Sequence, residues 1–197
     1  MKKKILIMIA VLVILGSGGI YMYNKLTNPN LGPKTTKLYQ RGFRLLEEQY
    51  GTYFKEHYKG IEKIEFSPIY VTGDDGSSML NAYVRPTIYD KYGHKATLGV
   101  PVKKFIPLSY GLSSDIILDF DGSGDEVIEL MDSEDRLVDV SKVKHLPNEA
   151  KLTKARSTDE NISLLVQDGQ LKDVVKDEKG SPEAKIFYNV KLSKEED

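Results

Sequence analysis

The segment 119–125, with the sequence Asp-Phe-Asp-Gly-Ser-Gly-Asp, has the spacing in this chain that best suits a chemical role. Its alternating oxygen-bearing side chains match the first, third and fifth positions of an EF-hand calcium loop, and Gly124 matches the sixth. The match ends at Leu130, which stands where that loop requires a bidentate glutamate. A polar hairpin turn is the alternative, because Asp and Gly are ordinary turn residues. The calcium candidates are Asp119, Asp121, Ser123 and Asp125.

The same segment lies within the most acidic part of the chain. Residues 115–135 contain nine Asp and Glu residues and no Lys or Arg. A local negative field of this kind can steer a basic protein partner. The alternative is a solvated acidic edge that discourages strand pairing. The candidates for partner binding are Asp115, Asp119, Asp121, Asp125, Glu126, Glu129 and Asp132.

No other constellation in the sequence points to catalysis. The chain has no cysteine, which excludes thiolate catalysis, disulfides and a lipid anchor on cysteine. Its three histidines, His57, His94 and His145, lie far apart and lack the spacing of a metal motif. The nucleophile elbow of serine hydrolases and the phosphate-binding loop of nucleotide enzymes are also missing. We therefore predict no catalytic residue and no cofactor, with calcium as the alternative for the cofactor and paired carboxylates as the alternative for catalysis.

The first two dozen residues predict a membrane anchor. Lys2, Lys3 and Lys4 precede eleven apolar residues at 5–15, and the apolar run resumes at 20–23. A helix over residues 5–23 would be about 28 Å long, which is enough to span the hydrocarbon core of a bilayer. A cleaved signal peptide with its small residues at 16–19 is the alternative. Because lysines next to a span stay in the cytoplasm, both interpretations place the rest of the chain outside.

For the rest of the chain the sequence predicts a short linker, one domain and a charged tail. Residues 25–35 contain the breaker pair Gly32-Pro33 and form the linker, residues 36–192 form the domain, and residues 193–197 form a charged tail. The formal net charge of the whole chain is -1, so its composition does not favour a nucleic-acid partner. An exported domain without cysteine is most typical of a Gram-positive bacterium.

A helix is predicted over residues 36–58, where aromatic and apolar side chains recur every three or four positions. These residues are Tyr39, Phe43, Leu46, Tyr50, Phe54 and Tyr58. From residue 61 the period changes to two, which predicts a first strand through Tyr70, a second over 79–89 and a third over 96–100. Pro86 within the second strand indicates a sheet edge or a bulge.

Two hairpins and a final strand complete the prediction. The first hairpin joins 116–120 to 127–131, and the second joins 162–166 to 171–175 across Asp168-Gly169, a pair that suits a primed turn. A last strand is expected over 184–192. The stretch 138–156 is left open between a short helix and a loop.

These elements predict an α+β fold in which one amphipathic helix packs on a mainly antiparallel sheet. The element order is similar to that of cystatin-like folds, an analogy of order alone. The expected function is that of a single-pass, membrane-anchored, extracytoplasmic binding or accessory protein of a bacterial cell surface, of the immunity type and without catalysis. The alternatives are secretion after cleavage, for the location, and a cell-envelope hydrolase with paired carboxylates, for the activity.

Overall fold

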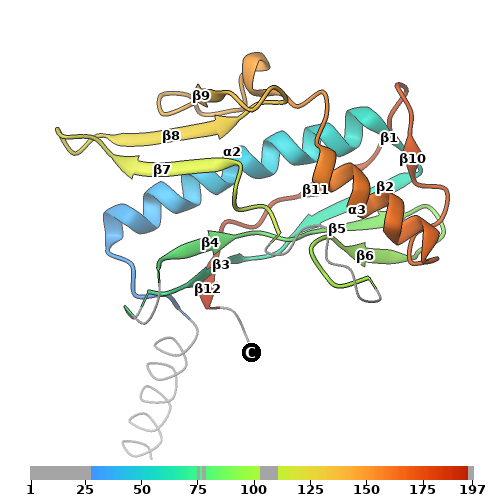
Figure 1. The fold of residues 1–197 in the computed structure, drawn as a ribbon, viewed down its shortest axis with the longest axis horizontal. Coiled ribbons are helices and arrows are strands. Elements are labelled where there is room, and N and C mark those ends of the chain that lie inside the picture. The colour runs from blue at the N-terminus through green and yellow to red at the C-terminus, as the bar shows by residue number, and fades with distance from the viewer. Residues whose placement is uncertain (1–27, 75, 77–78, 103–110, 195–197) are drawn as a thin grey trace, which may run out of the picture.

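The computed structural model describes residues 28–74, 76, 79–102 and 111–194. Over these residues the chain is α+β, with two α-helices and mainly antiparallel strand pairs, as the sequence predicts (Figure 1). The predicted anchor at 5–23 lies outside the described residues, as do residues 195–197 of the tail. Within the described part of the chain, no helix has both the length and the apolar character needed to cross a bilayer.

Helix α2 (Pro33–His57) is the longest element and confirms the predicted helix, with a start three residues earlier. Pro33 stands in the first turn, where its missing N–H costs no helical hydrogen bond and its fixed φ favours the helix. The helix ends at His57, and the backbone of the next residue, Tyr58, is extended. The predicted linker is therefore shorter than expected, because its Gly32-Pro33 pair starts the helix instead of preceding it.

Two glycines show that strands pack on opposite sides of α2 (Figure 1). Gly42 and Gly51 are nine residues apart, which is about half a turn around a helix of 3.6 residues per turn. A Cβ atom at Gly42 would meet Leu118 of strand β7 (Ile116–Phe120). A Cβ at Gly51 would lie 3.1 Å from Ile186 of strand β11 (Lys185–Phe187). The helix thus lies between two layers of strands, whereas the sequence predicted packing on one sheet.

Below α2 in Figure 1, strands form a four-stranded sheet in the order β11-β2-β5-β6. The bounds of its other members are β2 (Ile61–Phe66), β5 (Pro86–Asp90) and β6 (Lys95–Thr97). A three-stranded sheet in the order β12-β3-β4 continues it, with β12 (Leu192–Lys194), β3 (Ile69–Thr72) and β4 (Asn81–Tyr83). The two C-terminal strands β11 and β12 pair in parallel with β2 and β3, and the other described pairs are antiparallel.

Three predicted strands are each divided into two shorter strands. They are the strands predicted at 61–70, 79–89 and 184–192, and hydrogen bonds join the interruptions to one another. Pro68 cannot donate to a ladder, and the N–H of Arg85 bonds the Ser67 hydroxyl at 2.9 Å instead of a strand partner. The N–H of Ile69 in turn bonds the carbonyl of Lys191 at 2.8 Å. Pro86 is the first residue of β5, a position where a strand tolerates proline.

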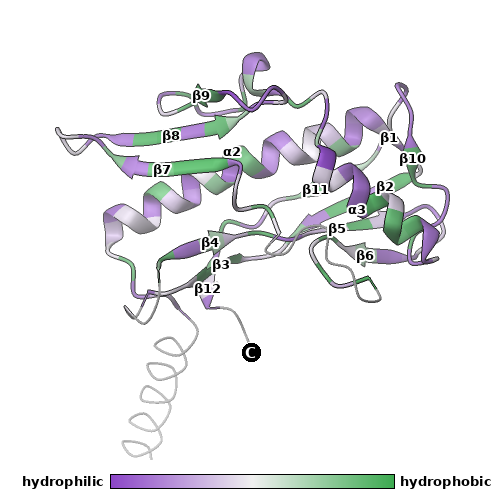
Figure 2. Ribbon diagram, in the orientation of Figure 1, coloured by the Kyte–Doolittle hydropathy of each residue, from purple (hydrophilic) through white to green (hydrophobic). Residues whose placement is uncertain are grey.

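Above α2 in Figure 1, a three-stranded sheet consists of β7, β8 (Glu126–Met131) and β9 (Leu137–Asp139). The β7–β8 pair confirms the first predicted hairpin, with Phe120 opposite Glu126. Figure 2 shows that most of β8 is hydrophobic, and its two buried residues, Ile128 and Leu130, alternate with less buried neighbours, as expected when one face packs on the core. The stretch left open contains the end of β9 and a single 3-10 turn, η1 (Asn148–Ala150).

The second predicted hairpin is wrong. Residues 162–166 belong to helix α3 (Arg156–Gln167), and Asp168-Gly169 ends this helix instead of turning a hairpin. Gly169 has a φ of +79°, its N–H bonds the carbonyl of Val166, and the N–H of Gln170 bonds that of Leu165. A glycine with positive φ suits a helix C-terminus as well as a primed turn. The Asp-Gly pair alone therefore does not distinguish the end of a helix from the turn of a hairpin. The short strand β10 (Val175–Lys176) pairs with β1 (Tyr58–Lys59).

A carboxyl group is buried where α2 meets the segment between β11 and β12. Glu47 is fully buried, and its Oε2 accepts a hydrogen bond of 3.0 Å from the N–H of Asn189. Its Oε1 has no hydrogen-bond partner within the described residues. Burial raises the pKa of Glu47 to about 8, against the opposing effects of the Asn189 N–H and of Arg44.

This raised pKa predicts that Glu47 opposes folding at alkaline pH. Its folded-state pKa of about 8 exceeds its ordinary value of 4.5, so its contribution to stability is complete below pH 4.5 and is lost as the pH rises through 8. Glu47→Gln should match the unsubstituted chain near pH 4 and exceed it at pH 9, by up to about 4–5 kcal/mol. Urea unfolding of the full chain, followed by tyrosine fluorescence, measures this difference.

Glu56→Gln is the control for this experiment, because Glu56 stands on the same helix with half of its side chain exposed. It should change the unfolding free energy by no more than about 1 kcal/mol at either pH, because its ion pair with Lys151 is exposed to solvent. Parallel pH profiles for the Glu47 variant and the unsubstituted chain would contradict the prediction.

Candidate functional site

A polar cleft of about 700 Å³ opens beside the end of the β7-β8-β9 sheet. One wall is the turn 132–135 after β8, and the other is the start of α3 with the residues that precede it. Tyr50 of α2 and Leu152 also line it. Hydroxyl and charged side chains predominate in the lining: Ser113, Ser114, Asp115, Ser133, Glu134, Asp135, Lys154, Arg156, Ser157 and Thr158. This lining suits a polar ligand better than an apolar one.

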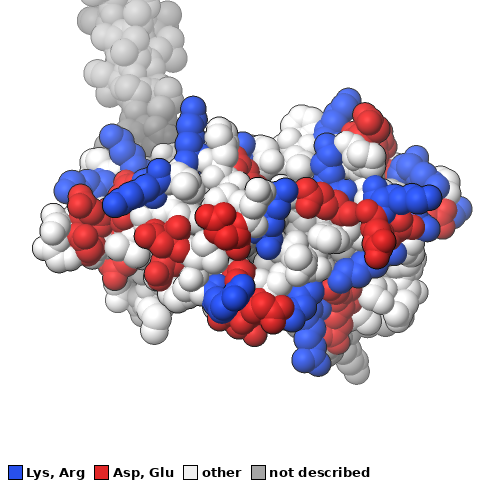
Figure 3. Space-filling view, turned by 90° about the horizontal axis from the view of Figure 1, so that it is seen from above, with Lys and Arg blue, Asp and Glu red and all other residues white. Residues whose placement is uncertain are grey.

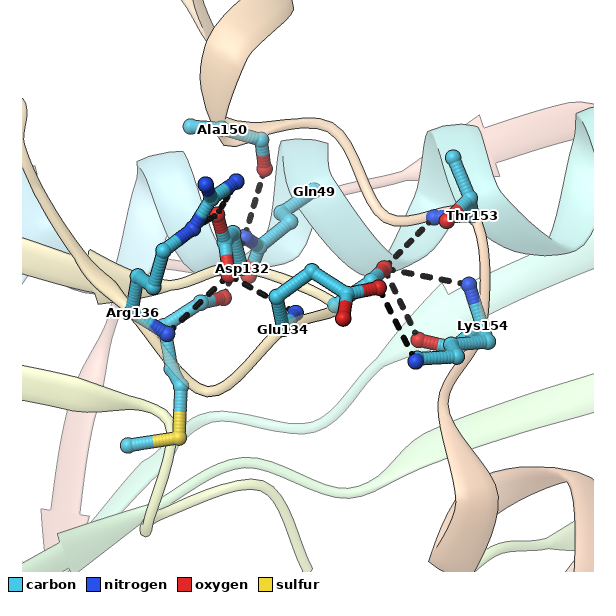
Figure 4. Close-up of polar contacts among 9 residues, drawn as sticks. Gln49, Asp132, Glu134, Arg136, Ala150, Thr153 and Lys154 are labelled. Carbon is cyan, nitrogen blue, oxygen red and sulfur yellow. Dashed lines mark hydrogen bonds and ion pairs between the residues drawn. The ribbon is translucent and has the colours of Figure 1, made fainter.

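Asp132 organises the turn wall (Figure 4). Its carboxylate accepts hydrogen bonds from the backbone N–H groups of Glu134 and Arg136, at 2.8 and 3.0 Å. It also forms an ion pair of 2.7 Å with the Arg136 guanidinium. Because Arg136 and these N–H groups favour the charged form, they lower the pKa of Asp132 below its ordinary value. Asp132 is therefore an ionised structural group near neutral pH.

Further hydrogen bonds join this wall to the opposite segment and to α2 (Figure 4). The Ser133 hydroxyl accepts from the N–H of Thr153 at 2.7 Å, and Lys154 pairs with Glu134 at 2.9 Å. The buried Gln49 amide donates to the carbonyl oxygens of Met131 and Ala150, at 2.9 and 2.6 Å. The cleft is consequently built on the rigid helix between the sheets rather than on loops alone.

Tyr50 holds Asp115 at the cleft. The buried Tyr50 hydroxyl donates a hydrogen bond to the Asp115 carboxylate. Burial, together with the negative charge of Asp115, raises the pKa of Tyr50 well above its ordinary value. Tyr50 therefore stays a neutral donor, and Asp115 keeps one orientation in the cleft wall.

Two tyrosine–aspartate pairs of different burial allow a matched test of this contact. Tyr92 also donates to an aspartate, Asp173, but its side chain is 47% exposed. Tyr50→Phe should lower the unfolding free energy by about 1–3 kcal/mol, because it removes a buried hydrogen bond to a charged group. Tyr92→Phe should lower it by less than about 0.5 kcal/mol. Equal losses in urea unfolding would contradict a special role for the buried pair.

The tertiary structure neutralises part of the acidic segment 115–135. Glu126 pairs with Arg41 of α2, Asp132 pairs with Arg136, and Glu134 pairs with Lys154. Figure 3 shows Lys and Arg interspersed with Asp and Glu on the side of the molecule seen from above. The negative field is therefore weaker and more local than the sequence predicts.

The four calcium candidates lie at or beside the β7–β8 turn and are solvent-exposed. One Asp121 oxygen accepts the backbone N–H groups of Ser123 and Asp125, at 2.8 and 2.9 Å. The turn thus closes on its own hydrogen bonds. In the described ranges no group of three or more His, Asp or Glu side chains is arranged to hold a metal ion. The alternative of a polar hairpin turn accounts for the geometry of this segment.

Strand register divides the other acidic candidates between two sides of the β7-β8-β9 sheet. Glu126 lies on the inner side with Leu118, Ile128 and Leu130, toward α2. Glu129 lies on the outer side, opposite both Ile117 and Asp139. We call the outer side the acidic sheet face; its residues are Ile117, Asp119, Val127, Glu129, Met131, Leu137 and Asp139.

The structure thus brings Asp119 and Glu129 together on the acidic sheet face, and Asp115 and Asp132 together in the cleft. Sequence reasoning missed Asp139 of the face and Arg156 of the cleft. The alternation Leu137-Val138-Asp139 was the available signal for Asp139. No sequence signal places the start of α3 opposite the turn 132–135, because that proximity is tertiary.

Comparison of the chain with protein-family models, with curated proteins and with solved structures finds no match. The functional argument therefore depends on the residues themselves.

Proposed function

We propose that this chain is a membrane-anchored, extracytoplasmic accessory protein of a bacterial cell surface that binds a basic protein partner, as an immunity protein would, without catalysis. The observation that carries this proposal is the acidic sheet face. Three carboxylates and four aliphatic side chains share it, and no Lys or Arg occupies a position in its register.

The chemistry of this face suits a protein partner. Ile117 and Leu137 are 42% and 45% exposed, although strands normally direct such residues to the core. Aliphatic side chains supply area that loses water on binding, and the surrounding carboxylates select a basic partner and accelerate its approach. The Asp139 carboxylate stays ionised, because hydrogen bonds from Ser141 lower its pKa.

The cleft extends this surface. Met131 belongs to the acidic sheet face and also lines the cleft, so the two surfaces are contiguous. Asp115 and Asp135 contribute carboxylates to the cleft. A Lys or Arg side chain of the partner has the length and charge to enter it.

A cell-envelope hydrolase is the second candidate, favoured by one observation: Asp115 and Asp132 line the same cleft. Acid–base hydrolysis requires one carboxylic acid with a raised pKa beside a carboxylate. The pKa of Asp132 is lowered instead. The pKa of Glu47 is raised to about 8, but Glu47 is buried against Asn189 and does not line the cleft. These features support binding over hydrolysis.

Protease treatment of intact protoplasts tests the proposed location. With a C-terminal tag on the full chain, we expect the tag to stay with the membrane fraction and to be lost to external protease. A protected tag would place the domain in the cytoplasm and overturn the proposal. A tag found in the medium would indicate the cleaved signal peptide.

Site-specific crosslinking tests the proposed binding. A photoreactive phenylalanine analogue at Ile117 should give a discrete adduct with a basic protein on intact cells. The same analogue at Val175 on β10, which is 40% exposed, should not give this adduct. Asp119→Asn combined with Glu129→Gln should reduce the adduct severalfold, because the steering charges are lost.

The matched control for these charge changes is Glu160→Gln with Glu178→Gln, at exposed positions outside the face and the cleft. It should leave the adduct unchanged. An adduct formed equally from both photoreactive positions, or reduced equally by both pairs of substitutions, would refute binding through the acidic sheet face.

A further inference from the structure

The four-stranded sheet β11-β2-β5-β6 has a second outward-facing surface of opposite charge. Its register aligns Ile186, Ile64, Ile88 and Ala96 in one row that faces the core. The neighbouring rows on the opposite side contain Lys185, Lys63, Tyr89 and Lys95, and then Phe187, Glu65, Thr87 and Thr97. We call these eight residues the basic sheet face.

Its exposed side chains are cationic and aromatic. Lys95 and Lys185 are exposed, and Phe187 is 49% exposed. Lys63 lies between the two aromatic rings, with its Nζ 3.6 Å from the ring centroid of Tyr89 and 5.9 Å from that of Phe187. The row of lysines crosses four strands at about 4.8 Å per strand, so it extends for roughly 14 Å.

The single acid of the basic sheet face is already engaged. Glu65 pairs with Lys63 at 2.8 Å and accepts a hydrogen bond from the Tyr89 hydroxyl. These contacts fix the orientation of the Lys63 and Tyr89 side chains in the middle of the row. They also leave Lys95 and Lys185 at its two ends without an ion pair among the described residues, so both can meet an incoming anion.

From this arrangement we infer that the basic sheet face binds a linear phosphodiester polymer, with the polymer running across the strands. Ammonium groups act as point charges that bind phosphate, and a row of them suits a chain of regularly spaced phosphates. The rings of Tyr89 and Phe187 supply apolar area for the uncharged units between phosphates.

A free polymer fits this face better than an anionic bilayer does. The lysines form one row instead of a broad patch, and each lysine near a bilayer contributes only about 1 kcal/mol. Excluding residues 1–24, the chain has more acidic than basic residues, which opposes approach to an extended anionic surface. This inference does not depend on the acidic sheet face.

The test uses the full-length chain in detergent micelles, with poly(glycerol phosphate) as the probe and neutral dextran as the uncharged reference. The unsubstituted chain should bind poly(glycerol phosphate) in a salt-sensitive manner and should not bind dextran. Lys63→Gln, Lys95→Gln and Lys185→Gln together should weaken binding about tenfold, because two exposed ammonium groups and the partly buried Lys63 between them are all lost. Glu65→Gln should strengthen it, because the substitution frees Lys63.

The matched control is Lys142→Gln, Lys144→Gln and Lys179→Gln, which removes the same charge at exposed positions elsewhere. Binding by this control should stay within about twofold of the unsubstituted chain. An equal loss in both triple variants, no binding of the polymer, or binding of phosphatidylglycerol vesicles alone would each overturn the inference. Asp119→Asn with Glu129→Gln should leave polymer binding unchanged, so the proposed function and this inference fail separately.

Discussion

Helix α2 packs between two layers of strands, and both outward-facing surfaces depend on this packing. Gly42 and Gly51 lie about half a turn apart, so the absence of a side chain lets β7 approach on one side and β11 on the other. Each sheet then places one row of apolar side chains toward the helix and its remaining rows on the outer side. The packing therefore generates two exposed sheet surfaces from one helix.

Burial on both sides forces polar groups of α2 into the interior. Glu47, Glu48 and Gln49 are all buried, and each binds backbone groups of other segments of the chain. Glu47 accepts the N–H of Asn189, Glu48 accepts that of Leu146, and the Gln49 amide bonds Met131 and Ala150. These contacts join backbone groups of three other segments to α2, so the helix organises the loops as well as the sheets.

The distribution of charge follows from the same arrangement. Arg41, Arg136 and Lys154 pair with acids of the 115–135 stretch, while Asp119 and Glu129 of this stretch lie on the outer side of β7 and β8. Lysines gather on the outer side of β2, β6 and β11. A chain with a formal net charge of -1 thus presents two sheet surfaces of opposite sign.

The sequence by itself determined the long helix, the α+β class, the first hairpin and the absence of thiol chemistry. Each of these depends on local periodicity, turn chemistry or composition. The second hairpin was mispredicted, because Asp168-Gly169 suits a helix C-terminus as well as a turn. The tertiary structure alone decided that Glu126 faces inward while Glu129 faces solvent, that Asp139 joins Asp119, and that lysines from three strands form one row. The physical reason is that strand register and long-range ion pairing depend on contacts between segments that are far apart in the sequence, such as β2 and β11.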